Sequence, residues 1–151
     1  MEIDEKDLDI IKLLQYNSRI TSRQIYRKTK IPITTIHNRI KKLEKYGIIK
    51  NFTVNLDYKK LGQPILVYVL ITINYTLPSG EKTTQEDVAK QVRKYSNIEE
   101  VNIVTGGVDM LIKARFKDID ELYDFISTKL RTIDGIDKSQ TLIALKSVNH
   151  H

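Results

Sequence analysis

The chain has 151 residues, of which 40% are hydrophobic and 29% charged, enough apolar sequence for one globular domain or two small ones. It contains no cysteine, which excludes disulfides, thiolate metal sites and cysteine nucleophiles. No apolar run approaches the roughly 20 residues that span a bilayer, and acidic residues rather than a signal sequence follow Met1. These features predict a soluble, cytoplasmic protein.

Positive charge is concentrated in one segment of the chain. The formal net charge is +6, but residues 19–60 contain twelve lysines and arginines against two acids, a net of +10. Residues 1–18 carry a net charge of −3, and the chain from residue 61 onward carries −1. An ordinary solvated surface mixes both signs, so this distribution indicates a nucleic-acid-binding module joined to a part that does not touch nucleic acid.

A first helix is predicted to begin after Asp4, whose side chain can cap it, with Asp7 near the positive end of the helix dipole. Its apolar face should pack under the helices that follow, and it should end near Asn17. The early acids are expected to lie in solvent at this helix start: Glu2, Asp4, Glu5, Asp7 and Asp9.

The basic segment predicts two short helices joined by a tight turn. Thr21 can cap the first helix reciprocally with Gln24, and the turn should span residues 29–32. The second helix should run from about Ile33 to Tyr46 and end at Gly47, since glycine suits the left-handed residue there. An apolar stripe along it faces inward: Ile36, Ile40 and Leu43.

The outward face of this second helix carries residue types that recognise DNA. Asn can bond adenine edges, Thr can contact a thymine methyl group, and Lys and Arg neutralise phosphates. We predict base contacts from Thr34, Thr35, His37 and Asn38, and mainly phosphate contacts from Arg23, Arg39, Lys41 and Lys42. A solvated, lysine-rich helix is the alternative, and Arg39 could brace the helix instead.

After Gly47 the alternation of apolar and polar residues from Ile48 to Leu56 predicts a strand. Gly62 and Pro64 then interrupt the pattern where the composition turns from basic to neutral. We therefore predict a DNA-binding domain over residues 1–50, a linker strand and hinge over 51–64, and a second domain over 65–151.

The second domain reads as strand, helix, strand, strand, helix, strand. The strands are expected at 65–75, 98–104, 110–116 and 136–145, and the helices at 84–95 and 119–130. This order folds as an antiparallel four-stranded sheet with both helices on one face. The other face is too apolar to remain exposed to solvent, so we expect it to pack on a second copy of the chain. The result would be a homodimer with two helix-turn-helix units.

Over nearly its whole length the chain resembles the Lrp/AsnC (feast/famine) family of transcriptional regulators. The segments that carry the resemblance are NSRITSRQI, TTIHNRIKKLEKYGIIKNFTVNLDYKKLG, TGGVDMLIKARF and RTIDGIDKSQTLIAL. The resemblance implies an α+β protein with an N-terminal three-helix winged helix-turn-helix domain and a C-terminal βαββαβ ferredoxin-like (RAM/ACT-like) domain. It also implies dimers that assemble into octamers, and a small effector, commonly an amino acid, bound between subunits.

The chain departs from the family pattern at three positions of the motif. Tyr26 stands where a small residue is usual, Lys30 where a glycine is usual, and Pro32 where a capping serine is usual. Lys30 is therefore expected to adopt a positive φ, which costs a non-glycine residue about 1 kcal/mol or somewhat more.

The turn between the two central strands is the candidate effector site. Thr105, Gly106, Gly107 and Asp109 lie there; the glycines let backbone N–H groups approach a carboxylate, and Asp109 could hold an ammonium group. From the residues alone, a hairpin turn capped by Asp109 explains them at least as well. The resemblance implies the effector site and extends it to Thr132, Ile133 and Thr141.

Two other functions compete with a sequence-specific regulator. Tetrapyrrole decarboxylases look like this family in fold, but their chemistry leans on histidine and arginine in the C-terminal domain, and the histidines here are His37, His150 and His151. We therefore predict no catalysis, cofactor or metal. A non-specific architectural DNA protein would also explain a segment of charge +10. Our prediction is a DNA-binding transcriptional regulator whose partners are duplex DNA, a second copy of itself and an amino-acid effector.

Overall fold

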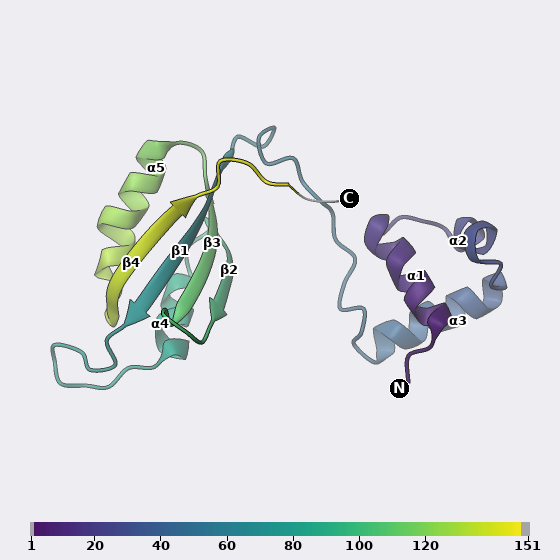
Figure 1. Cartoon of the computed structure of the whole chain (residues 1–151), viewed down its shortest axis with the longest axis horizontal. Coiled ribbons are helices and arrows are strands. Elements are labelled where there is room, and N and C mark those ends of the chain that lie inside the picture. Colours follow the sequence, from purple (N-terminus) through teal and green to yellow (C-terminus); the bar gives the residue numbers. More distant parts are fainter. Residues whose placement is uncertain (1, 149–151) are drawn as a thin grey trace. The chain divides into compact units, whose positions relative to one another are not determined.

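The computed structural model describes residues 2–148 and divides between Leu56 and Asp57 into two compact units. Unit 1, up to Leu56, is helical, and unit 2, from Asp57 onward, is a sheet with helices (Figure 1). The terminal pair His150 and His151 lies outside the described residues. Within residues 2–148, no helix is both long enough and apolar enough to cross a membrane.

Unit 1 consists of α1 (Glu5–Tyr16), α2 (Ser22–Thr29) and α3 (Ile33–Lys45). The predicted capping box of Thr21 and Gln24 at α2 is confirmed, and so is the predicted Asp4 cap of α1. The Asp7 side chain also accepts from the Asp4 N–H, so α1 begins with a reciprocal capping box that was not predicted. The three helices share a small apolar core, whose buried members are Ile10, Ile25, Ile31 and Ile36. This core fixes α3 beside α1 and α2.

The turn between α2 and α3 contains the predicted strained residue. Lys30 has φ 61°, the left-handed conformation that favours glycine, and its N–H donates to the Tyr26 carbonyl at 2.8 Å. Pro32 precedes α3 as its cap residue and makes no side-chain capping hydrogen bond. The helix therefore begins without the side-chain cap that the other two helices of unit 1 have.

The strand expected from Ile48 to Leu56 is not formed in unit 1. Residues 50–56 run without backbone pairing, although the Ser18 hydroxyl donates to the Thr53 carbonyl at 3.1 Å. The alternation predicted the spacing of apolar side chains correctly, but a strand also needs a hydrogen-bonding neighbour, and none of the described residues provides one. Three of its apolar side chains consequently remain 45–69% exposed: Phe52, Val54 and Leu56.

Unit 2 is the predicted antiparallel sheet, with strand order β2-β3-β1-β4 (Figure 1). Its strands are β1 (Ile65–Ile73), β2 (Ile98–Ile103), β3 (Met110–Phe116) and β4 (Ile136–Ile143). Its α-helices are α4 (Gln85–Val92), which precedes β2, and α5 (Ile119–Asp124), which follows β3. The βαββαβ order and the α+β class are confirmed.

Both helices pack on one face of this sheet. Alternate residues of β1 are buried against them, among them Val67, Val69 and Ile71, and Val88 of α4 and Leu122 of α5 belong to the same core. The opposite face carries half-buried apolar side chains, with Leu142 46% exposed. One face of the sheet is thus covered and the other is open.

The second helix of unit 2 differs from its expected form. The α-helix ends at Asp124, a π-helical turn follows over Phe125–Lys129, and a 3-10 turn covers Leu130–Thr132. Ile119, the first residue of the predicted helix, is 56% exposed, while Phe125 and Leu130 are each 1% exposed. The five-residue interval between them matches a π turn, in which the Leu130 N–H donates to the Phe125 carbonyl.

Candidate DNA-binding and effector sites

The predicted DNA-contact residues lie mostly on one surface of unit 1. Ile36 and Leu43 of α3 are fully buried, so the opposite side of the helix is turned outward. Six of the eight predicted residues are exposed: Arg23 on α2, and Thr34, His37, Asn38, Lys41 and Lys42 on α3. Thr35 and Arg39 are partly buried, and they occupy the flank of α3 that faces α1.

Arg39 is held by two carboxylates from the start of α1. The Nη1 atom of Arg39 lies 2.8 Å from Asp4 Oδ1 and 2.8 Å from Asp7 Oδ1. Hydrogen bonding to Asp7, with a smaller contribution from Asp4, raises the pKa of Arg39, so the guanidinium remains charged. These contacts support the bracing role for Arg39; phosphate contact by Arg39 stays a prediction.

The expectation that all five early acids are solvated is wrong for Asp7. Its residue is only 1% exposed, because the Arg39 guanidinium compensates its charge and the Asp4 N–H donates to it at 3.2 Å. Asp4 remains half exposed, and the Asp7 N–H, followed by Arg39, lowers the pKa of its carboxyl group. A partner 32 residues away in sequence could not be inferred from the helix start.

A hollow of about 450 Å³ lies beside this ion pair. Its acidic wall comes from Glu2, Asp4 and Asp7, and its other wall comes from α3 and the residue after it: Thr35, Asn38, Arg39, Lys42 and Tyr46. One flank of α3 therefore faces carboxylates, a feature that the helical periodicity alone did not reveal.

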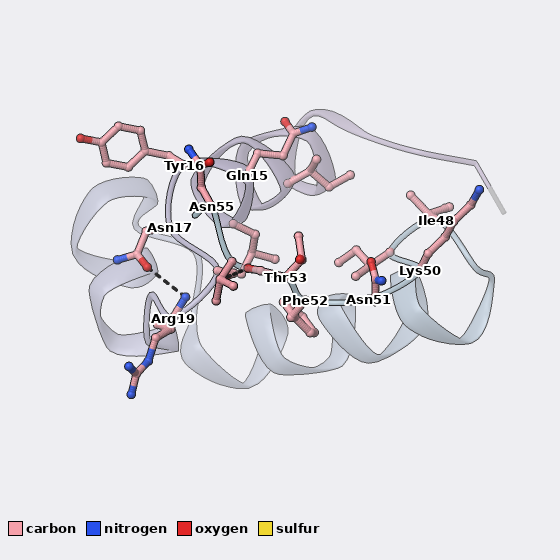
Figure 2. A pocket seen from close by; sticks show the side chains of 15 residues that line it. Gln15, Tyr16, Asn17, Arg19, Ile48, Lys50, Asn51, Phe52, Thr53 and Asn55 are labelled. Atoms are coloured by element: carbon pink, nitrogen blue, oxygen red, sulfur yellow. Dashed lines mark hydrogen bonds between the residues drawn. The ribbon is translucent and has the colours of Figure 1, made fainter. Parts of the chain in front are cut away.

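A second hollow of about 800 Å³ lies between the end of α1 and residues 48–55 (Figure 2). Apolar side chains such as Ile11, Leu14 and Phe52 line it, and Arg19 and Lys50 are its charged residues. The one hydrogen bond drawn near Arg19 is from its backbone N–H to Asn17 Oδ1, at 3.0 Å. Among the described residues that line this hollow there is no carboxylate or histidine.

In unit 2, the carboxylate of Asp109 already has three donors within the chain. The Ile73 N–H donates to Oδ2 at 2.8 Å, and the Tyr75 hydroxyl and Gln85 Nε2 donate to Oδ1 at 2.7 and 3.1 Å. The Tyr75 hydroxyl, then the Ile73 N–H, lowers the pKa of Asp109, so the carboxylate is ionised at neutral pH. Sequence reasoning missed Tyr75 and Gln85, which lie 34 and 24 residues from Asp109.

These donors lie at the end of β1 and beyond it, so the Asp109 carboxylate ties the start of β3 to the end of β1 and does not cap the turn between β2 and β3. A carboxylate has about four lone-pair sites, so Oδ2 retains one for a further donor. The Asp109 carboxylate therefore has one acceptor site left beside the three donors that it already has.

The structure brings together only part of the predicted effector set. Thr105, Gly106 and Gly107 are exposed, and Thr132 is exposed at the same end of the sheet, where β1 and β2 end and β3 and β4 begin. Ile133 is 5% exposed and belongs to the core, while Thr141 lies further along β4, opposite Val69. Thr141 is therefore separated along the sheet from the loop that carries Asp109.

A basic helix-turn-helix unit followed by a βαββαβ unit is the architecture of a two-domain DNA-binding regulator, and known proteins agree with it. The family model for a winged helix-turn-helix DNA-binding domain matches residues 3–50, and that for the Lrp/AsnC ligand binding domain matches residues 67–151. The HTH-type transcriptional regulator FL11 of Pyrococcus horikoshii is 36% identical over 145 residues, covering 96% of this chain and 91% of the relative. The chain belongs to the Lrp/AsnC family of transcriptional regulators.

Solved structures share this fold over the whole chain. LrpC of Bacillus subtilis superimposes with a TM-score of 0.84 at 26% identity, covering all of both chains. A transcriptional regulator of Neisseria meningitidis, solved as a complex with L-methionine, gives a TM-score of 0.88 at 24% identity, covering 99% of this chain and 94% of that one.

Proposed function

We propose that this protein is a sequence-specific transcriptional regulator that reads duplex DNA with the exposed side of α3. The observation that carries the proposal is that α3 is fixed by a buried stripe while its hydrogen-bonding and basic side chains project outward. Asn38 and Thr34 are suited to base edges, and the charge of +10 over residues 19–60 supplies attraction to phosphate. Since the relatives are regulators, we propose a regulator rather than an enzyme, acting in the cytoplasm.

Competition between DNA sequences tests this function. The protein is incubated with a labelled pool of duplexes of varied sequence while unlabelled, unrelated duplex is added in excess. A specific regulator keeps a subset of the pool bound, whereas an architectural protein loses all members in proportion, because its binding depends on phosphates alone. Loss in proportion contradicts sequence specificity, and absence of any binding contradicts the whole proposal.

We propose further that unit 2 binds a small effector, an amino acid, near the loop that carries Asp109. The match to a ligand-binding domain supports this, as do the ionised carboxylate with one acceptor site left and the L-methionine complex of the Neisseria neighbour. Thermal unfolding with each of the twenty amino acids tests it, since a ligand at 100 times its Kd stabilises by about 2.7 kcal/mol. No shift with any of them contradicts an amino-acid effector.

The assembly we propose is a homodimer through the open face of the sheet, with an octamer as the larger form that the family resemblance implies. Half-buried apolar side chains on that face support it, including Tyr68, Leu70 and Leu111, because a patch of this kind is rarely left in water. Sedimentation at several concentrations tests it. A monomer at all of them contradicts the proposal.

A further inference from the structure

The two flanks of α3 have different electrostatic surroundings. On one side, Thr35 and Lys42 line the hollow whose far wall is formed by the carboxylates of Glu2, Asp4 and Asp7. Arg39 lies on this side and is occupied by Asp4 and Asp7, so its charge offsets only part of the acidic wall. We call Thr35, Arg39 and Lys42 the α1-facing flank of α3.

The opposite side of α3 does not line this hollow. Thr34, His37, Lys41 and Lys45 follow one another at spacings of three and four, which places them along one side of the helix, and all four are exposed. We call these four residues the free flank. Glu44, three residues after Lys41, is the one acid within α3 and stands at the border of this flank near the helix end.

The two flanks of α3 differ in how favourably they can bind a DNA phosphate. A phosphate that approached Lys42 would also approach the three carboxylates across the hollow, and like charges brought together at an interface oppose binding. Lys41 does not line this hollow, so a phosphate at Lys41 does not face its three carboxylates. Lys42 instead lies opposite the carboxylates of Glu2, Asp4 and Asp7, whereas the charge of Lys41 is available to DNA.

We propose that DNA lies along the free flank of α3, with Thr34 and His37 toward base edges and Lys41 and Lys45 on phosphates. Asn38 stands between the flanks and is exposed, so it can still reach a base. Thr35 and Lys42 then serve the packing and charge balance with α1 rather than contact with DNA. This inference rests on the proposed DNA-binding function and divides the residues that the sequence predicted as one surface.

The adjacent lysines Lys41 and Lys42 provide a matched pair for the test, since both are exposed and neither has an ion-pair partner within 4.0 Å among the described residues. The Kd of the full-length protein for a random-sequence duplex is measured by fluorescence anisotropy over a series of salt concentrations, for the wild type, Lys41→Ala and Lys42→Ala. Each phosphate contact contributes a slope of about −0.9 to log K against log salt. Circular dichroism checks that both variants fold alike.

We expect Lys41→Ala to reduce the magnitude of the slope by about 0.9 for each DNA-bound subunit, and Lys42→Ala to leave it unchanged. Equal reductions in both variants, or a larger reduction in Lys42→Ala, overturn the assignment of flanks while leaving DNA binding itself intact. If the wild type binds no duplex at any salt concentration, the proposed function fails and this inference fails with it. The slope separates a phosphate contact from a structural role, because lost packing lowers affinity without removing a counterion.

Discussion

The buried carboxylate of Asp7 gives unit 1 a specific vulnerability. Replacement by alanine removes one of the two carboxylates that Arg39 contacts at 2.8 Å, and it removes the acceptor for the Asp4 N–H in the capping box. Removing one partner of a buried ion pair costs about 3–5 kcal/mol. Arg39 keeps Asp4 and is 24% exposed at its side chain, so we expect the low end of that range, about 3 kcal/mol for Asp7→Ala.

Native-state hydrogen exchange measures this loss where it occurs. The amides of Ile10 and Ile36, both in the fully buried core of unit 1, report its opening free energy separately from that of unit 2. Thermal unfolding of the whole chain would combine the transitions of the two units, so it cannot be treated as a two-state process. The matched control is Asp9→Ala on the same helix, where the exposed carboxylate should change stability by no more than about 0.5 kcal/mol. Equal effects of the two substitutions would refute the structural role of the Asp7–Arg39 pair.

Three further substitutions test other parts of the account. Lys30→Gly should stabilise unit 1 by about 1 kcal/mol in the same exchange experiment, because Lys30 has φ 61°; no gain would contradict strain there. Tyr75→Phe should destabilise unit 2 near neutral pH but progressively less as the pH falls below about 4 in urea titrations, because the Tyr75 hydroxyl lowers the folded-state pKa of Asp109 and that stabilisation disappears once Asp109 is protonated. A pH-independent difference would contradict this linkage. Gly135→Ala should lower the opening free energy of unit 2 in the exchange experiment, read at the amides of Val69 and Ile112, since Gly135 has φ +94° and an added Cβ would lie 2.9 Å from Thr83 Cγ2. An unchanged opening free energy would contradict this strain.

Local sequence patterns predicted the elements whose causes are local. The oxygen caps at Asp4 and Thr21 placed two helix starts, and β3 begins and ends at the predicted residues, Met110 and Phe116. The left-handed conformation of Lys30 was expected because the family that the chain resembles usually has a glycine at this position. In each case the physical cause lies within a few residues of the feature.

Features that depend on distant partners could not be predicted in this way. The burial of Asp7 requires Arg39, and the three donors around Asp109 include Tyr75 and Gln85 from a separate part of unit 2. The strand expected over 48–56 also depended on a distant partner. The local alternation of apolar and polar residues is present, but no described residue pairs with this segment, so no strand forms. The candidate DNA surface could be proposed from sequence because seven of its eight residues lie on one helix, α3, whereas the candidate effector site draws on three separate segments.

The most direct test of the central claim is selection of duplexes from a random-sequence library by the wild-type protein and by Thr34→Ala, followed by sequencing. A sequence-specific regulator that reads bases with α3 should enrich a defined motif, and the variant should enrich the same motif with relaxed preference at one or two positions. Retention of all sequences alike by the wild type, or the same motif at full stringency from the variant, would contradict the account.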